Sequence, residues 1–371
     1  MISDHLLTIV RCADCRGTLT RETPVGGRAP QKQHSGNTGA LICTGCGRQY
    51  ESPPDYLDIR PLETYAEQTK YLDEALHADA RHERVSSPLL GSRIRNGMLR
   101  MFLAPKPGER IADLGCGSGR AVLWNRDLGA EVIGIDIAPF FSHDARQQID
   151  LLLADLRQLP FADATFDKAW SLDVLEHLSP EALAGMLAEA ARVLKPGGAL
   201  FVYTHVRKNA PIAAGLKWIN RLATRLERWD LIDLRQERLR KSDHLNPLQD
   251  VPHLERVVAA AGFRIGQIRY YTPIVGGFVE NIMMRVAERA MARRAAARAT
   301  TKGAGAADAD AAAIREARTA AKARIAAGGP TYLALRALSF AMKLDLLLFG
   351  RIRSGPFFAL LVKEKSPIDN R

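Results

Sequence analysis

The chain has 371 residues, which is enough for one large α/β domain with additions or for two domains. Its formal net charge of +11 favours anionic partners such as nucleic acid or an acidic membrane surface. The first residues form too short an apolar run for a secretory signal, and no run of about 18 uncharged apolar residues is present. We therefore expect a cytoplasmic protein without a transmembrane helix.

Four of the five cysteines form two Cys-x-x-Cys pairs, Cys12 with Cys15 and Cys43 with Cys46. In a cytoplasmic protein such pairs usually indicate a metal site rather than disulfides. Four thiolates complete a closed tetrahedral zinc site, which has no open position for catalysis. We therefore expect a structural zinc module over residues 1–61, with residues 21–38 as a polar, glycine-rich insertion between the two pairs.

Residues 62–107 are expected to form a helical linker or cap, and the main domain is expected over 108–271. In that domain short apolar runs alternate with helical patterns. We predict helices over 179–194, which starts with a Ser-Pro pair, and over 250–262, which ends at a glycine. Six strands are predicted, at 109–114, 131–136, 150–155, 166–172, 199–204 and 263–271. This alternation predicts a doubly wound, mostly parallel sheet that binds its ligand at the carboxyl ends of the strands.

A glycine-rich turn and two acids mark those strand ends. The turn follows the first strand and reads DLGCGSG over 113–119, and Asp136 ends the second strand. Both dinucleotide enzymes and other enzymes with an adenosine-containing cofactor use this arrangement. Asp155, after the third strand, is able to accept the adenine amino group, which a dinucleotide enzyme does not need. The third acid therefore favours a cofactor other than NAD.

Five motifs in order resemble the class I S-adenosylmethionine-dependent methyltransferases, specifically the broad methyltransferase-11-like family. They are DLGCGSG (113–119), GID (134–136), DLRQLPFADATFD (155–167), DVLEHL (173–178) and VLKPGG (193–198). The resemblance implies a seven-stranded Rossmann-like sheet whose antiparallel last strand lies in 355–371. Residues 6–61 resemble the zinc-ribbon module that occurs as an activator of RNA and protein methyltransferases.

The resemblance also implies the binding residues of S-adenosylmethionine. Asp113 and the glycine turn would hold the methionine end, Asp136 the ribose hydroxyls, and Asp155 with Leu156 the adenine. The full expected set is Asp113, Gly115, Cys116, Gly117, Gly119, Asp136, Ile137, Asp155, Leu156 and Ser171.

The catalytic residues are not identified by the motifs, because methyl transfer requires mainly the alignment of nucleophile, methyl carbon and sulfur. Acid–base or metal-binding candidates follow strands four and five: Asp173, Glu176, His177 and His205. The alternative is that these residues cap the next helix and pack against the cofactor.

Two insertions are expected to select the acceptor. Residues 205–249 are expected to form a helical lid, with Arg221, Arg225 and Arg228 on one face and Leu216, Ile219, Leu222 and Leu226 on another. Residues 272–354 are expected to form a helical insertion before the last strand. Its part 330–350 is too charged to span a bilayer and too apolar to stand free. It either packs on the domain or presents Leu335, Leu338, Met342 and Leu346 to a membrane or an apolar substrate.

Three functions remain open from the sequence. The first is methyl transfer to a small-molecule or lipid-linked acceptor, with peripheral contact at the inner face of the membrane as an option. The second is methylation of rRNA or tRNA, which the basic charge would suit. The third is a non-enzymatic, zinc-dependent scaffold. The sequence does not identify the acceptor, the atom that is methylated or the oligomeric state.

Overall fold

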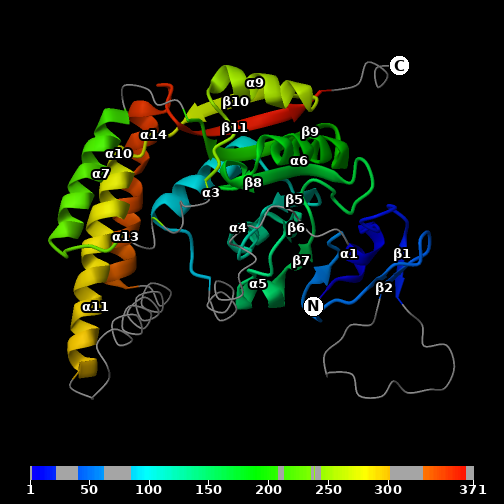
Figure 1. The fold of residues 1–371 in the computed structure, drawn as a ribbon, viewed down its shortest axis with the longest axis horizontal. Coiled ribbons are helices and arrows are strands. Elements are labelled where there is room, and N and C mark those ends of the chain that lie inside the picture. Colours follow the sequence, from blue (N-terminus) through cyan, green and yellow to red (C-terminus); the bar gives the residue numbers. More distant parts are fainter. Residues whose placement is uncertain are drawn as a thin grey trace.

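The computed structural model describes residues 2–21, 41–61, 85–207, 213–234, 238, 244–300 and 329–364. Its centre is an eight-stranded sheet in the order β10-β11-β9-β8-β5-β6-β7-β4 (Figure 1). The strands are β4 (Leu57–Asp58), β5 (Arg110–Leu114), β6 (Glu131–Asp136), β7 (Asp150–Leu153), β8 (Phe166–Leu172), β9 (Leu194–His205), β10 (Phe263–Tyr270) and β11 (Pro356–Lys363). The expected polar insertion between the cysteine pairs falls almost entirely outside the described residues, as does much of the expected linker.

The sheet confirms the predicted fold class. Strand β11 is antiparallel to β10 and β9, and the remaining neighbours are parallel. One correction concerns the number of strands, because the seven expected strands are joined by an eighth, β4. This strand comes from the N-terminal module and pairs with β7, with Leu57 opposite Leu152. A two-residue strand has no periodic pattern of its own, so the sequence did not reveal it.

Alternate residues of the strands supply the cores on the two faces of the sheet, as the period of two requires. On one face, Ala112 and Leu200 pack with α6 (Pro180–Val193) and α9 (Val251–Ala260). On the other face, Trp170 and Phe201 pack with α3 (Leu90–Leu103). Helix α6 begins as predicted, with the Ser179 side chain accepting a hydrogen bond from the Ala182 N–H. The shorter helices α4 (Arg120–Asn125) and α5 (His143–Gln148) follow β5 and β6.

The N-terminal module is joined to this sheet rather than tethered beside it. It contains α1 (Asp4–Ile9) and a small sheet of β1 (Leu19–Arg21), β2 (Leu41–Cys43) and β3 (Gln49–Tyr50). Its apolar side chains Leu6, Val10 and Ile59 are 0% exposed and belong to the same hydrophobic cluster as the central strands. The Ser3 N–H and hydroxyl both donate to the carboxylate of Asp150. The module therefore extends the main core.

In the sequence, a second addition connects β10 to β11. In space, it lies at the end of the molecule opposite the N-terminal module (Figure 1). It consists of α10 (Ile274–Phe278), the π-helical turn η4 (Val279–Met283), α11 (Met284–Thr300), α13 (Pro330–Ala341) and α14 (Lys343–Phe349). Helix α13 packs on α3, and the Ser339 hydroxyl accepts a hydrogen bond from the Leu90 N–H. The residues between α11 and α13 lie outside the description. Among the described helices, none is both long enough and apolar enough to cross a membrane.

Helix α7 (Ala213–Arg228) packs with this second addition. Its buried Ile219 and Ala223 share a small apolar cluster with Ile282 of η4. None of its described residues lines the cavity at the carboxyl ends of the strands, and the expected lid over 205–249 stays a prediction. The two faces of α7 are as the sequence predicted, because the three arginines are exposed and the apolar row is partly or fully buried.

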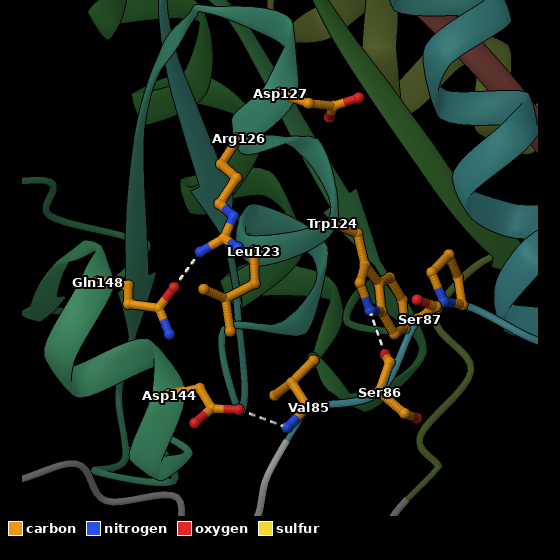
Figure 2. A pocket seen from close by; sticks show the side chains of 10 residues that line it. Val85, Ser86, Ser87, Leu123, Trp124, Arg126, Asp127, Asp144 and Gln148 are labelled. Carbon is orange, nitrogen blue, oxygen red and sulfur yellow. Dashed lines mark hydrogen bonds between the residues drawn. The ribbon is translucent and has the colours of Figure 1, made fainter. Parts of the chain in front are cut away.

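The segment that leads into α3 is fixed by hydrogen bonds around a polar pocket of about 330 Å³ (Figure 2). The Trp124 indole donates to the Ser86 carbonyl at 2.8 Å, and the Val85 N–H donates to the Asp144 carboxylate at 2.8 Å. Arg126 donates to Gln148 across the same pocket. These contacts tie residues 85–88 to α4 and α5.

Candidate cofactor and acceptor site

The glycine turn between β5 and α4 forms the floor of the site. Gly115, Gly117 and Gly119 all have positive φ angles, which side chains other than glycine rarely adopt. A Cβ on Gly115 would lie 2.4 Å from Cγ2 of Val174, whereas a Cβ on Gly117 would meet nothing within 4 Å. The turn thus packs tightly on one side and leaves open space on the other.

Asp136 lies at the end of β6, directly opposite the turn. One carboxylate oxygen accepts a hydrogen bond from the Gly117 N–H at 2.7 Å, and the other accepts from the Ala138 N–H at 3.1 Å. The turn and the strand end therefore hold each other in place. A carboxylate in this position is suited to accept hydrogen bonds from a ligand's hydroxyl groups.

Asp155 lies two residues after the end of β7 and is 7% exposed. Its carboxylate accepts from the backbone N–H of Arg157 at 2.8 Å, and the Arg157 guanidinium lies 3.2 Å away. Sequence reasoning missed Arg157, although an arginine two residues after a strand-end acid is a visible signal. A ligand that reaches Asp155 must share this carboxylate with Arg157.

These strand ends border one cavity of about 390 Å³. The cavity brings together most of the predicted cofactor residues, namely Gly115, Cys116, Gly117, Asp136, Ile137, Asp155 and Leu156. It also has walls that the sequence did not indicate, among them Arg120, Phe140 and Met186. Phe140 comes from the loop after β6 and Met186 from α6, and motif spacing does not report such packing.

Three of the predicted cofactor residues lie behind the cavity wall. Gly119 closes the turn against Ala145, and the Ser171 hydroxyl donates to the Leu114 carbonyl at 2.7 Å, which ties β8 to β5. Asp113 is 1% exposed, and its Oδ2 atom is buried without a hydrogen-bond partner among the described residues. Burial, together with the charge of Asp136, raises the pKa of Asp113 to about 8. A nearby cation would favour the ionised form of this carboxyl and lower its pKa.

Residues that follow β8 form another wall of the cavity. Asp173 has a φ of 57° and lies 3.6 Å from Arg95, and both Asp173 and His177 line the cavity. Glu176 is buried behind them and accepts a hydrogen bond from the Thr204 hydroxyl at 2.9 Å. Burial, and next the charge of Asp173, raise the pKa of Glu176 to about 7.

His177 belongs to a cluster of three histidines with His205 and His244. The ring centroids of His177 and His244 are 4.6 Å apart, and those of His244 and His205 are 5.5 Å apart. His244 was missed by the sequence analysis because it lies 67 positions from His177. Glu176, His177 and His244 each have a ligand atom within 4.8 Å of the others, so they form a possible donor set for a metal ion.

The four predicted zinc ligands also come together. Sγ of Cys12 lies 3.6 Å from Sγ of Cys46, and Sγ of Cys15 lies 3.3 Å from that of Cys43. All four sulfur atoms lie within 4.8 Å of one another. Gly17 packs against this group, because a Cβ there would be 2.9 Å from Sγ of Cys43. The donor set and its closed geometry fit a tetrahedral zinc ion.

The strand order, the glycine turn and the acids at successive strand ends define the class I S-adenosylmethionine-dependent methyltransferase fold. Residues 112–202 match the family model of the methyltransferase domain. The chain therefore carries a class I methyltransferase domain, as its motifs predicted.

Relatives of known name share this domain. The chain is 35% identical over 151 residues to the demethylmenaquinone methyltransferase of Tropheryma whipplei, a match that covers 38% of this chain and 62% of that protein. It is 34% identical over 106 residues to a sterol 4-C-methyltransferase of Caenorhabditis elegans, covering 26% and 31%. It is 36% identical over 108 residues to "Probable tRNA methyltransferase 9B" of Mus musculus, covering 28% and 24%. The chain thus spans less than two thirds of the length of these relatives, and their names refer to different acceptors.

Proposed function

We propose that the protein transfers a methyl group from S-adenosylmethionine to a small-molecule or lipid-linked acceptor. The observation that carries the proposal is the convergence of the glycine turn, Asp136 and Asp155 on one cavity. Each acid alone is compatible with a capping or solvated role. Their joint placement around a turn with an open glycine edge matches the needs of an adenosine-containing cofactor.

Different residues of the cavity would bind different parts of the cofactor. Asp136 would accept hydrogen bonds from the ribose hydroxyls, and Asp155 with the Leu156 backbone would read the adenine edge. The buried Asp113 would stabilise the cationic methionine end through the glycine turn. When bound, the cofactor supplies the methyl group on a sulfonium, which is already an activated electrophile.

We assign proton transfer on the acceptor side to His177. It lines the cavity, and His244 packs edge-on against its ring. Glu176 is held by Thr204 behind it and is a positioning residue in this scheme. An acceptor with a protonated nucleophile would need such a base, whereas an acceptor that is already nucleophilic would need only alignment.

We also propose that Cys12, Cys15, Cys43 and Cys46 hold a structural zinc ion. The four cysteines leave no position for a substrate in a tetrahedral site. They belong to the N-terminal module, and none of the described residues of that module lines the cavity. The zinc would therefore stabilise the fold rather than take part in methyl transfer.

The test of the cofactor assignment is Asp136→Ala. Loss of the carboxylate should weaken S-adenosylmethionine binding about tenfold or more, since a buried pair of hydroxyls loses its acceptor at a cost of about 1–3 kcal/mol. Titration calorimetry measures this, with Asp163→Ala as a control because that acid is largely exposed and does not line the cavity. Equal affinity in the Asp136 variant, or preferential binding of NAD by the unmodified protein, would contradict the proposal.

RNA is the second candidate acceptor. Helix α7 exposes Arg221, Arg225 and Arg228 along one face, and a row of arginines suits a phosphate backbone. RNA binding through this row should weaken steeply with salt, and replacing the three arginines by glutamine should reduce the salt slope. Methylation of a small-molecule fraction but not of RNA would exclude this candidate.

A further inference from the structure

The exposed side of α13 and α14 carries a continuous apolar stripe. Its large side chains follow helical spacing and are 62%, 72%, 43%, 73% and 59% exposed, in the order Leu333, Phe340, Leu344, Leu347 and Leu348. Ala337, which is also exposed, lies in the same row between the first two. Isolated exposed apolar residues are common, but a row of this length on two consecutive helices indicates a surface that contacts something.

This stripe is not the face that the sequence analysis proposed for a membrane. Leu335 and Met342 are buried, and Leu338 and Leu346 are partly buried against the core that contains α3 and Phe358. That expected face therefore packs on the domain. The exposed stripe is the opposite face of the same helices. One apolar face therefore packs on the domain, and the other is exposed.

Basic side chains border the stripe and exposed acids are absent from it. Arg336 and Lys343 lie along the stripe, and Arg351 and Arg353 are exposed at its end. Asp345 is the one acid in residues 330–353, and it is buried. Its carboxylate accepts hydrogen bonds from the N–H groups of two residues of α10. The surface therefore combines apolar contact area with uncompensated positive charge.

A groove beside the stripe has the same character. It lies between α3 and α14, has a volume of about 780 Å³, and shares Leu347 with the stripe. Arg93, Arg269 and Lys343 line it together with apolar side chains, and no carboxylate of the described residues lines it. Positive charge next to apolar walls is the arrangement that a phospholipid headgroup and its acyl chains require.

We propose that the face formed by α13 and α14 docks on the surface of an anionic phospholipid bilayer. The five large side chains of the stripe would enter the boundary between headgroups and acyl chains. Arg336 and Lys343 would stay at the level of the phosphates, with their aliphatic stems along the apolar surface. The Lys343 ammonium already lies 6.0 Å from the centroid of the Phe340 ring, so its stem runs beside the stripe.

The charge pattern argues against a second copy of this chain as the occupant. A two-fold interface brings the same patch of both copies together. Two copies of this face would place Arg336, Lys343 and Arg351 against their own equivalents, without an exposed acid on either face to pair with them. Anionic lipid supplies the missing negative charge.

The proposal goes beyond methyl transfer, because docking on a bilayer does not depend on cofactor binding. It would place the enzyme beside lipid-linked or membrane-dissolved acceptors. Failure of the proposed function would leave vesicle binding intact. Failure of docking would leave S-adenosylmethionine binding intact.

The test is co-sedimentation of the full-length protein with two sets of vesicles, one of phosphatidylcholine alone and one of phosphatidylcholine with phosphatidylglycerol. We expect the protein to bind the anionic vesicles, and to bind them more weakly at high salt. The double variant Phe340→Asp with Leu347→Asp should weaken this binding about tenfold or more, since two inserted side chains become charged. Arg336→Glu with Lys343→Glu should weaken it at low salt and much less at high salt.

The matched control is Trp229→Asp with Leu231→Asp, which changes two exposed apolar residues beyond the end of α7. It should bind anionic vesicles like the unmodified protein, and all variants should keep the same S-adenosylmethionine affinity and circular dichroism. Absence of vesicle binding by the unmodified protein would overturn the proposal. So would equal loss in the control, or a dimer in sedimentation velocity that the Phe340 and Leu347 changes convert to a monomer.

Discussion

The N-terminal module and the helical insertion are both additions to the same sheet, but their apolar side chains have different environments. Leu6, Val10 and Ile59 of the module are 0% exposed, while Phe340 and Leu347 of the insertion are more than 70% exposed. The module pairs β4 with β7 and continues the main core. The insertion buries one face of α13 and α14 and leaves the other uncovered by described residues. An addition of the first kind stabilises the domain, and one of the second kind offers a surface.

The largest difference in stability between the N-terminal module and the helical insertion should come from loss of the zinc ion proposed for the module. Zinc binding to four cysteines contributes apparent free energies of about 10–16 kcal/mol, which exceeds or matches the stability of a typical domain. Cys43→Ser should therefore release the zinc, unfold the module and lower the unfolding temperature of the whole chain, because the module shares its core with the sheet. Elemental analysis and thermal unfolding measure these changes.

The same elemental analysis tests the histidine cluster. One zinc per chain and no other metal would restrict Glu176, His177 and His244 to proton transfer or packing. A second divalent ion that persists in Cys43→Ser would assign them to a metal site. An unchanged unfolding temperature after loss of zinc would show that the module is an independent unit. It would contradict the claim that the module stabilises the domain.

A matched pair of apolar truncations should give the next largest difference. Ile59→Ala removes a fully buried side chain and should lower the free energy of unfolding by about 2–5 kcal/mol. Leu347→Ala removes a side chain that is 73% exposed and should change it by less than about 0.5 kcal/mol. Urea unfolding of both variants measures the difference. Similar losses would mean that the exposed stripe packs on part of the chain outside the description.

A smaller difference than that between Ile59→Ala and Leu347→Ala is expected at the anchor of the insertion. The Asp345 carboxylate accepts hydrogen bonds from the N–H groups of Val275 and Gly276 at 2.9 and 2.7 Å, so Asp345→Ala should cost about 1–3 kcal/mol. Burial raises the pKa of Asp345 above its usual range. The folded state then holds this proton more tightly than the unfolded state does. The stability from this group should fall as the pH rises above about 4 towards the raised pKa.

Asp345→Asn tests that sign, because the amide keeps an acceptor but does not titrate. Its stability relative to the unmodified protein should improve as the pH rises over this range, as measured by urea unfolding at several pH values. A difference that is constant with pH would mean that the pKa of Asp345 is the same in the folded and unfolded states, so that the carboxyl is ionised above about pH 4. The insertion would then be anchored by a charge rather than by a neutral carboxyl.

The strand positions, the glycine turn and the cysteine pairs followed from the sequence because each is encoded by neighbouring residues. Strands β6 and β8 match their predicted bounds, since alternation and apolar runs are local patterns. Asp136 and Asp155 could be assigned to the cavity because parallel strands end at the same edge of the sheet. The cavity walls Phe140, Arg157 and Met186 were missed, because loop and helix side chains reach the cavity only through packing.

By itself, therefore, the sequence determined the α/β class, the methyltransferase motifs and the two cysteine pairs, each of which rests on residues close together in the chain. Only the tertiary structure decided that β4 joins the sheet, that His244 lies against His177, and which face of α13 and α14 is exposed. The first two depend on contacts between residues far apart in the sequence. The third depends on α3, because helices with apolar residues on nearly every side carry no pattern that selects the buried face, and the partner that packs against them makes the choice.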